Sequence, residues 1–345
     1  MGQILVLPFS VIILALTWAS FVPQIQYVWQ TKDTRGISSA YLLFNLLCIT
    51  QHVFFHSLDV ANIWALSKLD PPPVSVSPLD WLNIAQLSGV WILSNIFFAL
   101  CLYYSHLHPP TNHRLRILLI LSIYAFFLLF TLVPLILDLT TDVFCPPSHP
   151  HNCLLPERDI VPFLRGVQCF YLLPVTTVIL PILGFYKQAQ LQRRRRRQQQ
   201  RRQQQQQHEQ TITPTSTSDL NLLLARPRLF QTVIFALSAI LWVFRLPPGQ
   251  QQSHDPPLAD PSQPAPLPRP WLPLFMDWWV FIGYLIVDDA IFAIGQGVLG
   301  YLGLRKAAAV APAEARSQRD DDDDDAERRP LLVASEEHSI YRSES

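Results

Sequence analysis

Charged residues and enzyme motifs are both scarce in this chain. Asp, Glu, Lys and Arg make up only 15% of its 345 residues. The chain has no GxSxG, GxxxxGK[ST] or HExxH motif, the patterns of α/β-hydrolases, P-loop nucleotide-binding proteins and zinc proteases. Their absence disfavours an enzyme and an ATP-driven pump. We therefore expect no catalytic residue, no cofactor and no metal ion.

Apolar residues, in contrast, make up 50% of the chain and gather in long blocks. About 20 apolar residues in a helix are enough to cross the ~30 Å hydrocarbon core of a membrane. Seven blocks come near or exceed that length, so we predict an all-α polytopic membrane protein with seven transmembrane helices. The predicted spans are 4–29, 38–57, 79–105, 114–137, 160–187, 229–246 and 272–304.

The basic residues are divided unevenly between the two sides of the predicted membrane. When the connecting segments are assigned alternately to the two sides, most of the 26 lysines and arginines fall on one side. Positively charged segments stay in the cytosol, so we expect a lumenal or extracellular amino terminus and a cytosolic carboxyl terminus. The first apolar block has no basic residue before it, so we interpret it as a retained span rather than a signal peptide.

Two cysteines lie in the predicted lumenal loop 138–158. In an oxidising lumen Cys145 and Cys153 can form a disulfide, which we favour over two free thiols. His149 and His151 lie between them, so the loop also holds a set of candidate metal ligands. Interspersed prolines and a spacing unlike that of common zinc motifs make the metal site the weaker alternative.

Residues 188–228 are predicted to form a disordered cytosolic linker, because arginine and glutamine runs dominate this low-complexity segment. Its consecutive arginines, Arg193–Arg197, anchor the topology and offer a surface to anionic lipid headgroups. We favour this role over nucleic-acid binding, because the segment is tethered beside a membrane span.

The tail 306–345 is also predicted to be disordered, and it contains a short sorting pattern. Glu327 lies four positions before the pair Leu331 and Leu332. This arrangement resembles the dileucine signals that adaptor complexes read on proteins bound for lysosomes or vacuoles. A chance match within a charged tail is the alternative.

An internal repeat relates the first three predicted spans to the last three. Gly89–Leu100 in the third span and Gly283–Ile294 in the seventh share a glycine, a polar pair and Phe-Ala at the same offsets. Val22–Ile25 in the first span and Leu180–Leu183 in the fifth share a proline. One span separates the two sets, so both enter the membrane in the same direction as parallel repeats, which is a transporter architecture.

The repeat predicts two parallel triple-helix bundles joined by a linker helix, a 3+1+3 organisation. The segments are a first triple-helix repeat (1–106), a linker helix (107–137), the lumenal loop (138–158), the first helix of the second repeat (159–187), the cytosolic linker (188–228), the remaining two helices of the second repeat (229–305) and the cytosolic tail (306–345).

Pro23 and Gln24 near the end of the first span, followed by Lys32–Ser38, resemble the motif of the PQ-loop family. This family includes the SWEET sugar transporters, cystinosin and the vacuolar and lysosomal cationic amino-acid transporters. The resemblance implies two triple-helix bundles with a substrate path between them. It also implies proline hinges for alternating access, which are Pro23 with Gln24 in the first bundle and Pro181, without a following glutamine, in the second.

The last span carries a second part of the resemblance. Family members on vacuolar and lysosomal membranes have an aspartate there, five residues after a glycine, and Asp288 follows Gly283 at that spacing. The family pattern continues with a glutamine six residues beyond the aspartate, whereas Gln296 lies eight residues beyond Asp288. This looser part of the match implies a vacuolar or lysosomal membrane.

Two adjacent aspartates, Asp288 and Asp289, lie near the middle of the last predicted span, where each carboxylate costs about 2.5 to 3.5 kcal/mol. We favour a functional role, in binding a cationic solute or exchanging a proton, over a structural one. Ser94 and Asn95 are the equivalent pair of the third span, so the repeat predicts one central site for all four residues. For Asn95 an ordinary interhelical hydrogen bond is an equal alternative.

Other polar residues within the predicted spans are weaker candidates. Gln51 in the second span and Gln168 in the fifth are amides of the same kind as Asn95. His52 and His56 lie four residues apart on one helical face, a spacing that can bind a metal ion or sense acidity. For this histidine pair we favour a polar face at the membrane interface.

The sequence thus predicts a secondary transporter of a small polar solute, with a cationic amino acid as the candidate, moved from an acidic vacuole or lysosome together with protons. Its expected partners are the small-molecule substrate, protons, membrane lipids and an adaptor complex at the tail, and no nucleic acid. A SWEET-like sugar facilitator is an alternative, although paired aspartates count against it. A seven-span receptor that transports nothing is the other.

Overall fold

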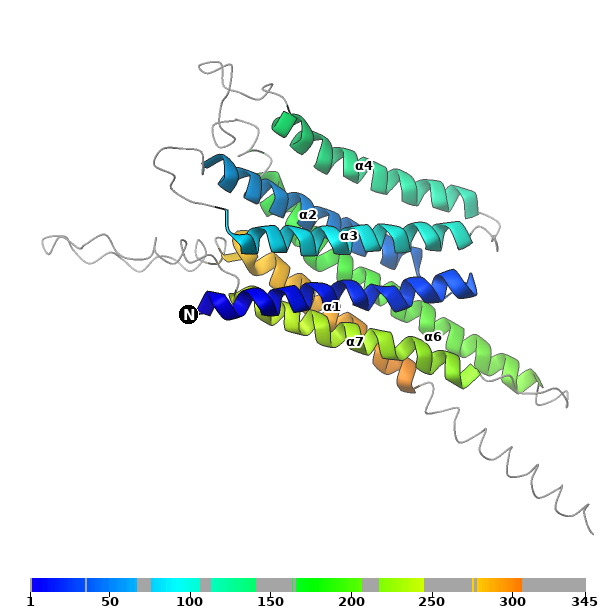
Figure 1. The fold of residues 1–345 in the computed structure, drawn as a ribbon. Coiled ribbons are helices and arrows are strands. Elements are labelled where there is room, and N and C mark those ends of the chain that lie inside the picture. The colour runs from blue at the N-terminus through cyan, green and yellow to red at the C-terminus, as the bar shows by residue number, and fades with distance from the viewer. Residues whose placement is uncertain are drawn as a thin grey trace, which may run out of the picture.

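The computed structural model describes residues 2–34, 36–66, 76–105, 113–140, 163, 166–206, 217–244, 275 and 278–305. Every regular element among these residues is helical (Figure 1). The long helices are α1 (Gly2–Thr31), α2 (Ser39–Leu66), α3 (Pro78–Ser105), α4 (His113–Thr140), α6 (Leu180–Gln206), α7 (Thr217–Phe244) and an unlabelled last span, Tyr284–Arg305. Three short π-helical turns complete them: η2 (Gln168–Leu172), η3 (Val175–Ile179) and η4 (Trp279–Gly283).

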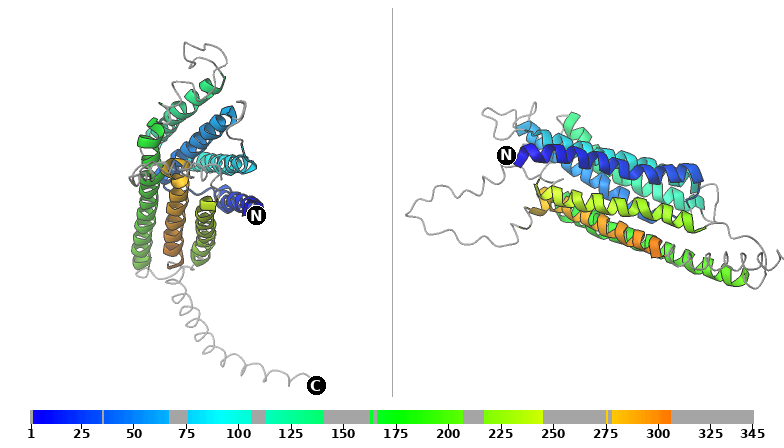
Figure 2. Two further views of the ribbon diagram at one scale, coloured as in Figure 1. Left: turned by 90° about the vertical axis from the view of Figure 1, so that its left-hand side faces the viewer. Right: turned by 60° about the horizontal axis from the view of Figure 1, so that its bottom comes forward.

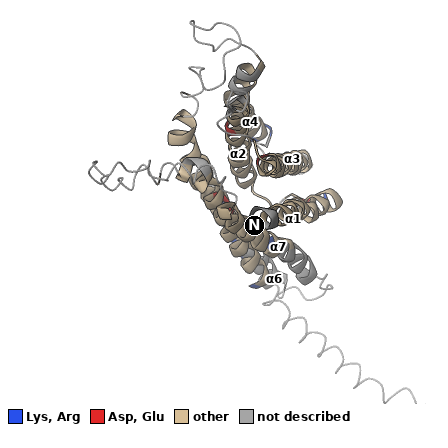
Figure 3. Ribbon diagram, turned by 60° about the vertical axis from the view of Figure 1, so that its left-hand side comes forward, with Lys and Arg blue, Asp and Glu red and all other residues tan. Residues whose placement is uncertain are grey.

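Seven helices among the described residues are long and apolar enough to cross a membrane. This confirms the predicted all-α polytopic class and its number of spans. The membrane-crossing parts are Val6–Thr31, Ser39–Ala61, Pro78–Ser105, Arg114–Val133, Gln168–Arg195, Pro227–Phe244 and Tyr284–Arg305. In the end-on view of Figure 3, charged residues occupy few positions along these helices.

Large apolar side chains cover the outside of the helices. Phe126 of α4 and Phe170 of η2 are 71% and 63% exposed, and Ile12, Leu118 and Val233 are also exposed. Monomeric soluble proteins rarely show apolar patches of this extent. The surface therefore suits contact with lipid chains.

The two predicted sets of three helices correspond to α1, α2 and α3, and to the fifth span (η2, η3 and α6), α7 and the last span. The third helix of each set lies between the other two. α3 packs against both α1 and α2. In the second set, Phe292 of the last span contacts Phe185 of α6 and Phe235 of α7, and the left panel of Figure 2 shows the last span (orange) between those helices. The two sets meet where α2 packs against α6 and α1 packs against α7, while α4 packs against α2.

Close contact between the first and third helix of each set depends on a glycine. A Cβ atom on Gly89 of α3 would lie 2.1 Å from the Trp18 ring of α1. A Cβ atom on Gly295 of the last span would lie 2.5 Å from the Phe185 ring of α6. Small residues allow such approach in membrane helix packing, so each set is held by an aromatic ring against a glycine.

Residues 188–228 were expected to be disordered, but much of this segment is helical in the structure. α6 continues to Gln206 and α7 already begins at Thr217. Arginine and glutamine are good helix formers, so they extend a helix that the apolar fifth span has already started. The structure does not describe 207–216.

Several predicted features lie outside the described residues. The candidate disulfide of Cys145 and Cys153 falls in the segment 141–162. The sorting pattern of Glu327, Leu331 and Leu332 falls in the tail 306–345. Both stay predictions.

Candidate functional site

Asp288 lies where the last span faces α2, and two side chains of α2 surround its carboxylate. The Cys48 thiol donates a hydrogen bond to Oδ1 at 3.1 Å, and Nδ1 of His52 lies 3.4 Å from Oδ2. Cys48 and His52 are four residues apart and therefore share one face of α2. Nε2 of His52 lies 3.1 Å from Oγ1 of Thr177 in η3. A chain of polar groups thus links the last span, α2 and the fifth span.

His52 is only 1% exposed, and Asp288 is 16% exposed. The interpretation of His52 as an interfacial residue is therefore wrong. A histidine at this spacing can lie either at the membrane interface or against another helix. Its contact with Asp288 depends on α2 packing against the last span, which no local pattern reveals.

Asp289 points to a different neighbour. Its Oδ2 accepts a hydrogen bond from Nε1 of Trp242 in α7 at 2.9 Å. Successive residues of an α-helix point about 100° apart, so the two carboxylates face α2 and α7 respectively. The last span thereby presents one acid to each set of helices.

A cavity of about 70 Å³ lies between the two sets. Asp288, Asp289, Ser94 and Gln24 all line it, so three of the four predicted site residues meet there. A water molecule occupies about 30 Å³ in the liquid. The cavity thus has room for about two water molecules and is far smaller than the ~300–1,000 Å³ of common ligand pockets.

Asn95 does not line this cavity. Its Nδ2 donates to the Trp91 carbonyl at 2.8 Å, and its Oδ1 accepts a hydrogen bond from the Tyr124 hydroxyl of α4 at 2.8 Å. Ser94 points inward, so its neighbour on the helix points toward α4. The geometry matches the alternative for Asn95, an interhelical hydrogen bond.

Aromatic rings flank Asp288 one helical turn away on each side. Before it, the Tyr284 ring lies 5.3 Å from the rings of both His52 and Phe55. After it, the Phe292 ring lies 4.4 Å from the Phe235 ring of α7. The acid therefore lies between two layers of packed aromatic side chains, which the sequence did not single out.

Pro23 lies inside α1, next to a hydrogen-bonded link between α1 and α7. Proline has no N–H group, so one carbonyl of the preceding turn loses its helical partner. Nε2 of Gln24 donates to Oε1 of Gln231 in α7 at 2.8 Å, and Nε2 of Gln231 donates to the Ser20 carbonyl at 3.2 Å. Gln24 and Gln231 therefore tie α1 to α7 beside the proline.

The proline of the fifth span lies in an irregular helix. Pro174 directly precedes the π-helical turn η3, and Pro181 follows that turn by two residues. Such turns and prolines are the usual causes of helix kinks. Ile182, at the position equivalent to Gln24, is 50% exposed on an apolar surface. A glutamine there would be exposed on this surface, whereas Gln24 reaches another helix.

Two buried amides form a pair whose hydrogen bonds are incomplete. Gln51 of α2 donates through Nε2 to Oε1 of Gln168 in η2. Among the described residues, Oε1 of Gln51 and Nε2 of Gln168 have no partner. A buried polar atom left unpaired costs about 1–3 kcal/mol. The pair therefore keeps two hydrogen-bonding atoms that no described residue uses.

Three side chains of the site have the spacing that a metal ion requires. Cys48, His52 and Asp288 each offer one ligand atom, and these atoms lie within 4.8 Å of one another. Sulfur, nitrogen and oxygen ligands together suit a transition-metal ion such as Zn²⁺. Imidazole and carboxyl groups also take up and release protons, so the same arrangement suits proton exchange.

The fold is that of an integral multi-pass membrane protein, with apolar side chains on the outside of the helices and a carboxylate, Asp288, in a cavity between α2 and the last span. Residues 8–65 match the family model of the PQ loop repeat. The match covers most of α1 and α2 with Pro23 and Gln24, and it confirms the predicted resemblance to the PQ-loop family over these residues. Comparisons with curated proteins and with solved structures gave no match.

Proposed function

We propose that this protein is a secondary transporter that moves a small polar solute by alternating access, with Asp288 exchanging a proton during the cycle. The observation that carries the proposal is the contact of Asp288 with Cys48 and His52 between the two helix sets. An acid at this junction changes its surroundings whenever the sets move relative to one another. The PQ loop repeat and the seven apolar helices support the transporter class.

The helix contacts support an arrangement of two parallel sets. If the first set is exchanged with the second, the contact of α1 with α7 becomes the contact of α6 with α2, and both contacts exist. The central position of α3 and of the last span is exchanged in the same way. Such equivalence is expected of parallel repeats related by an axis along the membrane normal.

The small cavity supports a cycle that passes through a closed state. Aromatic layers lie on both sides of Asp288, at Tyr284 and at Phe292. For a solute to reach the acid, one layer has to open while the other stays packed. The prolines in α1 and in the fifth span are placed to allow such bending.

We infer a cationic amino acid as the candidate solute because Asp288 and Asp289 both line the cavity. The inferred membrane is that of a vacuole or lysosome, with a lumenal amino terminus and a cytosolic carboxyl terminus. This part of the proposal is supported by the distribution of lysine and arginine and by the dileucine pattern in the tail. An acidic lumen would supply the proton.

A SWEET-like sugar facilitator is the second candidate, and the neutral polar part of the cavity lining favours it. Asn45 and Ser94 line the cavity, and amide and hydroxyl groups can hydrogen-bond to sugar hydroxyls. Such a facilitator needs no proton. It would therefore work equally well with and without a pH gradient.

The test is uptake of labelled lysine, arginine, cystine and glucose into vesicles that contain the full-length protein. We expect uptake of a cationic amino acid that depends on a pH gradient and is reduced in Cys48→Ala, which removes the hydrogen-bond donor to Asp288, but kept in the matched control Cys101→Ala. Cys101 is also buried, but it lies away from the cavity. Gradient-independent glucose uptake would favour the facilitator. Absence of all uptake would favour a receptor that does not transport.

A further inference from the structure

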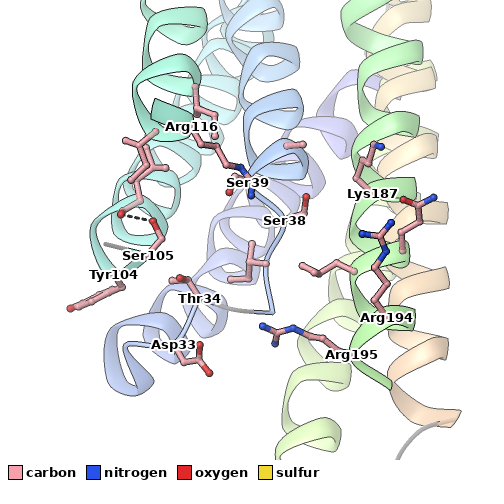
Figure 4. Close-up of a pocket in the computed structure, with 17 residues that line it drawn as sticks. Asp33, Thr34, Ser38, Ser39, Tyr104, Ser105, Arg116, Lys187, Arg194 and Arg195 are labelled. Carbon is pink, nitrogen blue, oxygen red and sulfur yellow. Dashed lines mark hydrogen bonds between the residues drawn. The ribbon is translucent and has the colours of Figure 1, made fainter. Parts of the chain in front are cut away.

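A second hollow, of about 810 Å³, lies at the end of the helices where the α1–α2 turn, α3, α4 and α6 meet (Figure 4). Ligand pockets commonly have volumes of about 300–1,000 Å³. It shares no lining residue with the cavity at Asp288. Its charged lining consists of Arg116, Lys187, Arg194, Arg195 and Asp33. We call this hollow the basic pocket.

One face of α6 supplies most of the positive charge. Lys187, Leu191, Arg194 and Arg195 line the pocket at spacings of one and two helical turns, and they therefore share one side of the helix. Arg116 faces them from α4 (Figure 4). Arg193 belongs to the same helix but does not line the pocket. The basic pocket is thus formed by selected positions of the arginine run and not by the run as a whole.

The positive charge of the pocket is poorly compensated. Within the described ranges, Arg116, Lys187 and Arg194 make no hydrogen bond or ion pair. Asp33 is the single acidic residue of the lining, against four basic ones. Arg116 also lies in the first turn of α4, where the helix dipole already disfavours a cation. An anion in the pocket would remove both conflicts.

Hydrogen-bond donors for such an anion are present at the start of α2. Ser38 and Ser39 line the pocket at the helix amino terminus, where the first backbone N–H groups have no partner within the helix. The N–H group of Ser38 is already used, because it donates to Oε1 of Gln188 at 2.7 Å. The hydroxyl groups and the following N–H groups complement the cations.

The surroundings of the pocket indicate a lipid. Leu115 and Leu118, on either side of Arg116 in α4, are 74% and 63% exposed. Acyl chains can lie along this apolar surface while the headgroup enters the pocket. Ile117 and Ile120 form part of the pocket wall itself. The apolar side of α4 therefore leads directly to the basic groups.

We propose that the basic pocket binds the headgroup of an anionic phospholipid with more than one phosphate, of the phosphoinositide class. Four basic groups against one acidic group leave more charge than a single phosphate neutralises. Basic pockets between membrane helices bind such headgroups by the same combination of charge and position.

The bound lipid would connect the two helix sets. α6 forms one wall of the pocket, and the α1–α2 turn, α3 and α4 form the other. Gln188 already bridges the same junction, since its Nε2 donates to the Gly36 carbonyl at 2.8 Å. A headgroup held by both walls stabilises this arrangement relative to one in which the walls separate. The lipid thereby regulates the opening of this end of the protein.

The test is lipid binding to the full-length protein in detergent. Binding is measured by native mass spectrometry with a short-chain phosphatidylinositol bisphosphate. Soluble inositol trisphosphate, phosphatidylserine and inorganic phosphate serve as comparison ligands. The pocket variant is Lys187→Gln with Arg194→Gln. The control, Arg193→Gln with Arg197→Gln, removes the same charge from positions of α6 outside the pocket. A thermal unfolding scan of each variant checks its folding.

We expect the pocket variant to weaken binding of the bisphosphate lipid at least about tenfold, because it removes two of the four basic groups that line the pocket. The control variant should change it less than about threefold. Equal losses in both variants would overturn the pocket as a site. Equally tight binding of soluble inositol trisphosphate would overturn the lipid as its source, and equally tight binding of phosphatidylserine would overturn the need for several phosphates.

Discussion

The hydrogen-bonded link of Gln24 and Gln231 beside Pro23 gives a prediction about how the two helix sets are held together. Gln231→Leu removes the bonds to Gln24 and to the Ser20 carbonyl, whereas Gln24→Leu removes only the bond to Gln231. Interhelical hydrogen bonds in membranes contribute about 0.6 kcal/mol on average. We therefore expect losses in unfolding free energy of about 1.2 kcal/mol for Gln231→Leu and about 0.6 kcal/mol for Gln24→Leu.

A double-mutant cycle isolates the shared bond. We expect the two losses to overlap by about 0.6 kcal/mol in the double variant, because both single changes break the same hydrogen bond. The assay is reversible unfolding in mixed micelles, with each variant measured under identical conditions. Gln26 is exposed on the same helix, so Gln26→Leu with Gln231→Leu is the matched control pair. A coupling no larger for Gln24 than for Gln26 would refute the link.

Two further changes test the packing between helices. Gly89→Ala places a methyl group against the Trp18 ring, so overpacking should lower the unfolding free energy by about 1–3 kcal/mol; an unchanged value would show that the ring has room to shift. Tyr124→Phe removes the hydroxyl that donates to Asn95, which should cost about 0.6 kcal/mol in stability and leave solute uptake unchanged. Loss of uptake with unaltered stability would instead indicate that Asn95 takes part in solute binding.

The spans were predictable because each depends on a local property, an apolar run long enough to cross a bilayer. The position of Asp288 in a cavity between helices was predictable for a similar reason, since an acid exposed to lipid in such a run is costly. Its partners were not. Cys48 and His52 reach Asp288 only because α2 packs against the last span, and the sequence does not contain that contact in any local pattern.

The pair Ser94 and Asn95 shows a second limit. The repeat predicts that this position of the third span faces the centre, and Ser94 lines the cavity together with Asp288 and Asp289. It did not indicate which member of the pair points inward, because that depends on the rotation of α3 relative to α4. Asn95 therefore bonds to Tyr124 instead. Similarly, Gln231 carried no sequence signal until its contact with Gln24 was known.

The most direct test of the central claim is pH-gradient-driven uptake of labelled lysine and arginine by Asp288→Asn in reconstituted vesicles. Asparagine keeps the size of the side chain but carries no titratable proton. The account predicts that gradient-driven accumulation is lost, while exchange of labelled for unlabelled solute continues without a gradient. Gradient-driven uptake equal to that of the unmodified protein would contradict the assignment of proton exchange to Asp288.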